Sequence, residues 1–267
     1  MKKISKVLAA LAISALMAAP AFAQDKIKVG TTTGADVEII EKAAEVAKRN
    51  GLEVQIIEFS DYVRPNLALA DKDVDVNSFQ HLPYLETFNK ERGLNLTSIG
   101  ATYISPIGYY SKKIKSLDEL KEGDKLAIPN DPTNGGRALL LLQKAGFITL
   151  KEGSGLTATP FDIVENKLKL KIVEMDAAQT PRAMEDVAAS AINNTFAIPA
   201  GLNPLKDAIY LEDADSPYVN VVVARPEDKD NPVYKKFVEA YQSQEVAEFI
   251  LKKFEGATIP AFEYEKK

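Results

Sequence analysis

The sequence contains no cysteine, and its 267 residues include a single histidine, His81. Without cysteine we expect no disulfide, no thiolate metal site, no cysteine nucleophile and no lipid-modified N-terminal cysteine. One histidine without cysteine also argues against a transition-metal site, so we expect no metal. A Gly-x-Ser-x-Gly nucleophile motif and the glycine-rich motifs of nucleotide-binding proteins are missing as well. These absences argue against a hydrolase and a bound cofactor, and they favour a binding protein over an enzyme.

Long apolar runs are also scarce, and the one near the N-terminus is too short to span a bilayer. The first 23 residues combine three lysines with an apolar run over residues 7–19 and end on the small-x-small sequence Ala21-Phe22-Ala23. This pattern is typical of a secretory signal peptide, with a retained membrane anchor as the alternative. Cleavage after Ala23 would remove 23 of the 267 residues and leave 244, beginning at Gln24.

Positive charge is not in excess, since the sequence has 33 Lys and Arg and 38 Asp and Glu. Removing the three lysines of the signal changes the formal net charge from −5 to −8. Such a chain offers no basic face that could neutralise phosphates, so we expect no nucleic-acid partner. An exported protein without disulfides depends on a large core, and 244 residues are enough for one or two domains.

Strand-like and helix-like segments alternate from Ile27 onward and predict an α/β protein. We expect mixed, mainly parallel sheets covered by helices on both faces. Two long apolar segments, 101–111 and 216–225, lie where a strand could cross between two lobes. If both cross, residues 24–109 and 221–267 form lobe 1 and residues 110–220 form lobe 2. A ligand cleft would then lie between the lobes.

The most informative motif is Phe79-Gln80-His81-Leu82-Pro83-Tyr84. It follows an alternating run over residues 73–77, which predicts a short strand that ends in an X-Pro turn. Rings at such a strand end could wall an apolar pocket, and a neutral imidazole would add a polar edge. The alternative is a satisfied histidine beside a packed aromatic pair.

A second motif covers residues 130–137, Asn-Asp-Pro-Thr-Asn-Gly-Gly-Arg, between a predicted strand at 125–129 and a predicted helix at 138–144. The glycines could let the backbone approach a ligand, and the start of a helix offers free N–H groups. Arg137 adds a planar fork, so the motif suits one carboxylate. The alternative is an Asp-Pro turn that caps a helix whose arginine is solvated.

Three asparagines are further candidates, because a carboxamide can accept from an ammonium group and donate to a carboxylate. Asn193 and Asn194 end a strand-like segment at 189–192, and Asn194 is equally explained as a turn residue. Asn220 lies inside the apolar segment 216–225, where asparagine is disfavoured. Asn220 is therefore the stronger candidate of the three.

From Lys26 to about Gly256 the chain closely resembles the methionine-binding components of ABC importers, the NlpA/MetQ-type family. Several motifs carry this resemblance in the same order as in the family. They are Asp61-Tyr62-Val63, Phe79-Gln80-His81-x-Pro83-Tyr84, the block from Tyr110 to Leu120, Asn130-Asp131-Pro132-Thr133-Asn134-x-Gly136-Arg137, Ile192-Asn193 and Ser216-Pro217-Tyr218-Val219-Asn220.

The resemblance implies a two-lobed periplasmic binding protein that encloses free L-methionine and delivers it to a permease and ATPase complex. It places the methionine side chain among Tyr62, Phe79, His81 and Tyr84. It also assigns the carboxylate to Arg137 and the amino-acid head to Asn193 and Asn220, with Asn194 only as a neighbour.

The chain departs from the family at its N-terminus. Most relatives carry a lipid-modified cysteine, whereas here Ala21-Phe22-Ala23 is followed by Gln24. We therefore expect a soluble protein in the periplasm of a Gram-negative bacterium, and we expect a monomer. A methionine-containing dipeptide or another neutral apolar amino acid stays open as the ligand. A hydrolase that uses His81 and a surface or adhesion role are the alternatives from other classes.

Overall fold

The computed structural model describes residues 25–213 and 216–265. The signal peptide predicted for residues 1–23 lies outside this part of the chain. Within the described residues, no helix has the length and apolar character needed to cross a membrane.

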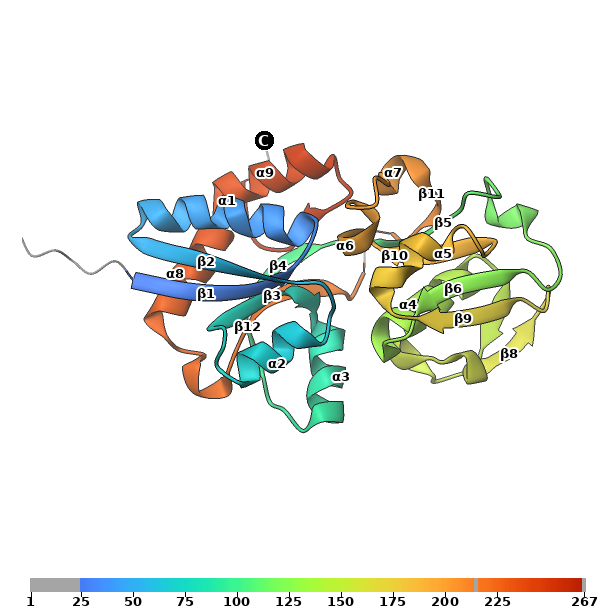
Figure 1. The fold of residues 1–267 in the computed structure, drawn as a ribbon, viewed down its shortest axis with the longest axis horizontal. Helices are drawn as coiled ribbons and strands as arrows, with labels where there is room; N and C mark the ends of the chain where they lie inside the picture. Colours follow the sequence, from blue (N-terminus) through green and yellow to red (C-terminus); the bar gives the residue numbers. More distant parts are fainter. Residues whose placement is uncertain (1–24, 214–215, 266–267) are drawn as a thin grey trace, which may run out of the picture.

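The chain folds into two lobes, and each has its own sheet (Figure 1). The strands of the first sheet, in spatial order, are β13 (Ile259–Pro260), β4 (Thr97–Ile104), β12 (Val219–Ala224), β3 (Val76–His81), β1 (Asp25–Thr32) and β2 (Leu52–Phe59). Helices cover both faces of this sheet. They are α1 (Ala35–Arg49), α2 (Arg64–Ala70), α3 (Leu82–Arg92), α8 (Pro232–Tyr241) and α9 (Gln244–Phe254).

Helix α1 shows how apolar spacing builds the core of the first lobe. Ile39, Ile40, Ala43 and Ala47 recur at helical spacing and are fully buried. They pack with residues of α8 and α9 on one face of the sheet. On the other face, Leu69 of α2 and Leu85 of α3 belong to a second cluster, which also includes alternate residues of β12.

The second lobe is built on a five-stranded sheet. Its strands, in spatial order, are β11 (Ala208–Leu211), β5 (Ile107–Tyr110), β10 (Ala189–Asn193), β6 (Lys125–Pro129) and β9 (Lys171–Met175). A separate two-stranded sheet holds β7 (Ile148–Leu150) and β8 (Ile163–Asn166). The helices are α4 (Pro132–Lys144), α5 (Thr180–Ala183), α6 (Asn194–Ala197) and α7 (Pro204–Asp207). Short 3-10 turns lie at Leu117–Glu119, Gly155–Thr157, Pro160–Asp162, Ala177–Gln179 and, back in the first lobe, Pro226–Asp228.

The chain passes to the second sheet inside the predicted segment 101–111, and it returns between β11 and β12, which overlaps the predicted segment 216–225 only at residues 216–218. Ser105 and Pro106 join β4 of the first sheet to β5 of the second, and residues 212–218 lie between β11 and β12. The predicted lobe boundaries, 109/110 and 220/221, cut through β5 and β12. Because each of these strands belongs to one sheet, we propose that the lobes divide at Ser105–Pro106 and within residues 212–218.

The sheets are mixed, as predicted, but they are not mainly parallel. Among the described strands four pairs are parallel (β1–β2, β1–β3, β6–β9 and β6–β10) and six are antiparallel. Parallel neighbours need a crossover connection, which the β-α-β units of each lobe supply. Strands that enter a sheet from the other lobe run the opposite way, so β5 and β12 pair antiparallel on both of their edges.

Candidate ligand-binding site

One pocket lies where the two lobes meet, and its empty space, with the solvent at its mouth included, is about 390 Å³. All seven residues predicted to bind the ligand line it, and six further residues complete the wall. The thirteen are Tyr62, Phe79, Gln80, His81, Tyr84, Tyr103, Ser105, Asn134, Arg137, Asn193, Asn194, Thr195 and Asn220. Their contact with a ligand stays a prediction.

The motif at residues 79–84 is a strand that runs straight into a helix, which differs from the predicted X-Pro turn. Phe79 and His81 belong to β3, and Pro83 occupies the first turn of α3, where its missing N–H costs nothing. His81 caps that helix, because its Nδ1 accepts a hydrogen bond of 3.1 Å from the Tyr84 backbone N–H. One sharp junction therefore brings Phe79, His81 and Tyr84 to the same pocket.

The motif at residues 130–137 is also helical over most of its length. Asp131 caps α4 by accepting from the Asn134 N–H at 2.9 Å, and Arg137 lies in the second turn. The glycines serve packing and not the approach of a ligand. A Cβ at Gly135 would lie 2.8 Å from the Pro129 carbonyl oxygen, and a Cβ at Gly136 would collide with the backbone of Leu156.

The aromatic wall consists of Tyr62, Phe79 and Tyr84, whose ring centroids lie 6.0 to 6.1 Å apart. The Tyr84 hydroxyl donates to the Tyr62 carbonyl oxygen at 2.7 Å, which fixes the two side chains relative to each other. Tyr62 also meets Phe196 of the second lobe, with a centroid distance of 5.0 Å. Tyr62 thus links the aromatic wall to a ring of the second lobe.

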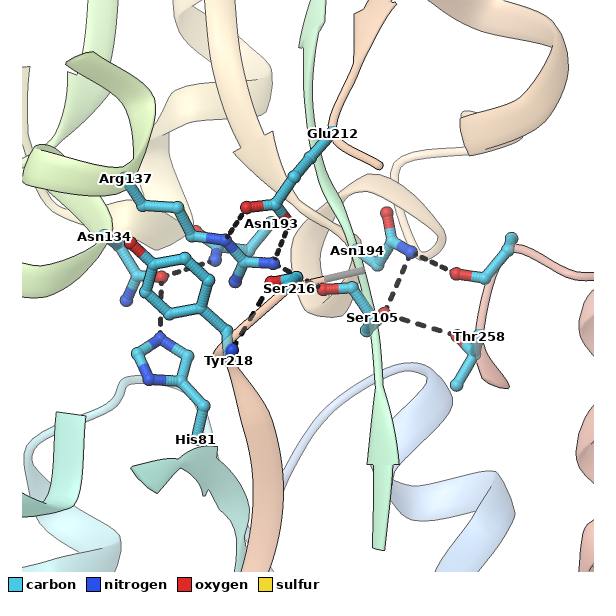
Figure 2. Close-up of polar contacts among 11 residues, drawn as sticks. His81, Ser105, Asn134, Arg137, Asn193, Asn194, Glu212, Ser216, Tyr218 and Thr258 are labelled. Atoms are coloured by element: carbon cyan, nitrogen blue, oxygen red, sulfur yellow. Dashed lines mark hydrogen bonds and ion pairs between the residues drawn. The ribbon is translucent and has the colours of Figure 1, made fainter. Parts of the chain in front are cut away.

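Arg137 is only 3% exposed, so the alternative of a solvated arginine is wrong. Its guanidinium forms a bidentate ion pair with Glu212, in which Nε donates to Oε1 at 2.9 Å and Nη2 to Oε2 (Figure 2). Nη2 also donates to the Ser105 carbonyl oxygen at 2.9 Å, and the guanidinium lies 4.1 Å from the centre of the Tyr218 ring. All three partners lie in or beside the segments that cross between the lobes.

A chain of carboxamides and imidazole joins the lobes beside Arg137 (Figure 2). Since His81 Nδ1 accepts from the backbone, its Nε2 carries the hydrogen and donates to Asn134 Oδ1 at 3.3 Å. The same oxygen accepts from Asn193 Nδ2 at 2.8 Å. Burial, and then the charge of Arg137, lower the pKa of His81 to about 3. His81 is therefore neutral and satisfied, and it lines the pocket as well.

Two asparagines of the pocket each keep a buried acceptor without a partner in the described structure, Asn193 Oδ1 and Asn194 Oδ1. Their amide groups are already engaged, since Asn194 Nδ2 donates to Ser105 Oγ and to the Ala257 carbonyl oxygen, each at 2.9 Å. Buried acceptors without a donor are costly, so a ligand that brings N–H groups would satisfy them. Asn194, expected to be only a neighbour, thus lines the pocket. Asn220 lies opposite His81 in the β3–β12 pairing.

A buried carboxylate, Asp36, lies behind the pocket and was missed in the sequence. It accepts from the hydroxyls of Thr32 and Tyr103 in the first lobe and from Thr195 Oγ1 of the second lobe at 3.4 Å. Burial raises the pKa of Asp36 to about 7, against the opposing effect of these hydrogen bonds. Tyr103 and Thr195 line the pocket, so Asp36 orients two of its polar side chains.

Glu212 was also missed, because 75 residues separate it from Arg137 and no motif surrounds it. Asn134 lies inside the motif at 130–137 and could have been proposed from its place in the first turn of a helix. Among the described residues, no group of three or more His, Asp or Glu side chains is arranged to hold a metal ion.

Two α/β lobes joined by two crossing segments, with a pocket between them that has a polar end and an aromatic wall, define a solute-binding protein. The chain belongs to the NlpA lipoprotein family, which matches residues 27–262.

Named relatives and solved structures agree with this family over most of the chain. The D-methionine-binding lipoprotein MetQ of Salmonella typhimurium is 54% identical over 236 residues, 87% of each chain. The protein of the same name from Escherichia coli K12 is 52% identical over 236 residues, also 87% of each chain. A nutrient-binding protein from Burkholderia cenocepacia, solved bound to methionine, is 55% identical with a TM-score of 0.87, covering 88% of this chain and 100% of that one.

Proposed function

We propose that this protein binds methionine between its lobes and delivers it to an ABC importer. The observation that carries the proposal is a pocket that combines one buried guanidinium with an aromatic wall and has no acidic residue among its lining side chains. The names of the relatives and the methionine-bound structure support the same ligand class.

The head group of an amino acid fits the polar end of the pocket. A buried zwitterion is stable only when both charges find partners. Glu212 and Ser105 engage Nε and Nη2 of Arg137, so we assign the ligand carboxylate to the remaining nitrogen, Nη1. The acceptors Asn193 Oδ1 and Asn194 Oδ1 suit the ammonium group, with Asn220 completing the head-group contacts.

The methionine side chain fits the aromatic end. A thioether is polarizable and gains roughly 0.3–1.5 kcal/mol from each contact with a ring edge. Tyr62, Phe79 and Tyr84 offer such edges, and neutral His81 adds none of the charge that would favour an acidic side chain. A charged amino acid would find no opposite charge among the side chains of this wall.

Mass spectrometry of the small molecules released from purified, denatured protein tests the ligand directly. Methionine is the expected species. Release of a methionine-containing dipeptide or of another apolar amino acid would instead identify that molecule as the ligand. Calorimetry with the D and L forms then decides the enantiomer, since the family resemblance implies L-methionine and the relatives are named for D-methionine. Release of neither form, together with no heat of binding for either, would contradict the proposal.

We further propose that the protein is a soluble periplasmic monomer and not an enzyme. The relatives are named lipoproteins, but the chain has no cysteine to carry a thioether-linked lipid. Against the hydrolase alternative, both ring nitrogens of His81 already have partners, namely the Tyr84 N–H and Asn134. A base in that state has no free nitrogen with which to activate a nucleophile.

A further inference from the structure

Tyr84 has a cavity on both of its sides. It lines the pocket between the lobes and also a second cavity between α3 and the start of α4, whose empty space, with the solvent at its mouth included, is about 580 Å³. Of all the lining side chains, Tyr84 is the one that the two cavities share. Its ring therefore stands as a partition between them.

A row of contacting side chains fixes where this partition lies along a bound ligand. From the Arg137 guanidinium the row passes to the Tyr218 ring at 4.1 Å, from there to His81 at 4.9 Å, then to Tyr84 at 6.1 Å, and finally to Phe88 at 5.9 Å. Along this row Arg137 and Tyr84 are thus separated by Tyr218 and His81. A ligand whose carboxylate meets Arg137 points its side chain toward Tyr84.

The partition is held firmly but depends on one side chain. The hydroxyl donates to the Tyr62 carbonyl oxygen, and the ring packs edge-on against Tyr62, Phe79 and His81 on the pocket side and stacks on Phe88 on the other. The backbone also passes between the cavities at two places, because Tyr62 and Asn134 line the first, whereas Val63 and Thr133 line the second. Tyr84 is the one residue that lines both, so truncating its ring is the side-chain change that can join them.

The second cavity offers an apolar entrance and a charged rim. Val63 and Phe88 lie beside Tyr84, whereas Glu91, Arg92 and Asp131 are further lining residues, and the Arg92 guanidinium lies 5.6 Å from the Phe88 ring centre. An unbranched hydrocarbon chain that passes the position of Tyr84 would enter a cavity that offers Val63 and Phe88 as apolar contacts beside polar and charged side chains.

We propose that Tyr84 determines the side-chain length that the protein accepts, and that truncating it admits neutral unbranched α-amino acids longer than methionine. This inference rests on the proposed function, because it uses the ligand orientation that Arg137 sets. In the wild-type protein the Tyr84 ring ends the pocket, and a longer chain has to displace a ring that is held by a hydrogen bond and four ring contacts.

The test is calorimetric titration of a length series into wild type and four variants. The series is norvaline, norleucine, 2-aminooctanoic acid and 2-aminodecanoic acid. Wild type should bind 2-aminooctanoic acid at least tenfold more weakly than norleucine. Tyr84→Ala should bring the two within threefold of each other or reverse their order. Tyr84→Phe keeps the ring, so it should keep the wild-type length limit.

Phe79→Ala is the matched control, because Phe79 lines the pocket but not the second cavity. It removes a ring of similar size and should weaken all four ligands without changing the length limit. Tyr84→Leu is titrated as a second truncation. If the melting curve of Tyr84→Ala shows that it is poorly folded, Tyr84→Leu decides the outcome.

Three outcomes overturn the inference. These are a wild type that binds 2-aminooctanoic acid as tightly as norleucine, Tyr84 variants that keep the wild-type limit, and a Phe79→Ala variant that shifts the limit as far as they do. Methionine binding by the wild type is measured first. If it is absent, the proposed function fails, whereas an unchanged limit with intact methionine binding contradicts the role of Tyr84 alone.

Discussion

Arg137 and Glu212 form a bidentate ion pair at the back of the pocket, and the pair joins helix α4 of the second lobe to the segment that returns the chain to the first. Arg137 is buried and Glu212 is 15% exposed, so neither charge is freely solvated. Arg137, which we propose binds the ligand carboxylate, is therefore held by a residue of the segment that connects the lobes. The same guanidinium would contact both the ligand and this connecting segment.

Replacing Arg137 by alanine should strongly weaken methionine binding, because the ligand carboxylate would be buried without its charged partner. Such losses cost roughly 3–5 kcal/mol, a factor of about a hundred or more in affinity. Calorimetry is the measurement, and Lys144→Ala, which breaks the exposed pair with Asp213 nearby, is the control that should bind normally. An Arg137→Ala affinity within threefold of wild type would remove Arg137 from the site.

Glu212→Gln should weaken methionine binding by roughly 1–2 kcal/mol, less than the loss of Arg137, because glutamine keeps the shape but only one acceptor for the fork. If Glu212 acts by holding Arg137, the effects are not additive. Glu212→Gln should then cause no further loss of the residual affinity in an Arg137→Ala protein, measured by competition at high ligand concentration. Full additivity would show that Glu212 acts independently of Arg137.

Phe79→Ala should weaken methionine by roughly 2–4 kcal/mol through lost burial and an unfilled cavity. Selectivity should fall with it, since Arg137 and the asparagines hold groups common to all amino acids. Titrating methionine, leucine, glutamine and alanine into both proteins measures this. A variant that keeps its preference for methionine, or a wild type that prefers a charged amino acid, contradicts the assignment of the wall.

Two buried groups should impose opposite pH dependences on stability. The pKa of His81 is lowered from 6.5 to about 3, so the unfolded state binds the extra proton and stability is lost as pH falls from 6.5 to 3. The pKa of Asp36 is raised from 3.8 to about 7, so the folded state binds the extra proton and stability is lost as pH rises from 3.8 to 7. Between pH 3.8 and 6.5 the two slopes, each about 1.4 kcal/mol per pH unit, oppose each other.

Single variants separate these slopes. In Asp36→Asn only the His81 slope remains, and the free energy of unfolding should fall from pH 6.5 to 4.5 relative to wild type. In His81→Asn it should rise over the same interval. Urea unfolding at three pH values in this range measures both differences. Parallel pH profiles for all three proteins would contradict the proposed charge states.

The mature protein should begin at Gln24 and be released with the soluble periplasmic contents, because a small-x-small site precedes Gln24 and the chain has no cysteine. Mass spectrometry of the protein purified from its own cells gives the terminus. An intact Met1 or a lipid-modified terminus would contradict this prediction.

Much of the site was visible in the sequence because it lies within short motifs. His81 lies at a strand-to-helix junction and Arg137 lies in the second turn after another, and such junctions in α/β proteins face the ligand. The type of each junction was wrong in detail. Phe79 and His81 belong to the strand itself. Gly135 and Gly136 lie inside a helix that begins at Pro132 after the Asp131 cap, where the backbones of Pro129 and Leu156 leave no room for a Cβ.

By itself the sequence determined the β/α alternation and the residue types at the pocket, because these depend on local spacing and composition. Tertiary structure alone decided which strands pair antiparallel, and it alone brought Glu212 to Arg137 and Thr195 to Asp36. These contacts join residues 75 and 159 positions apart. Nothing local marks such partners, because their interaction becomes favourable only after both lobes have folded and excluded water from the cleft.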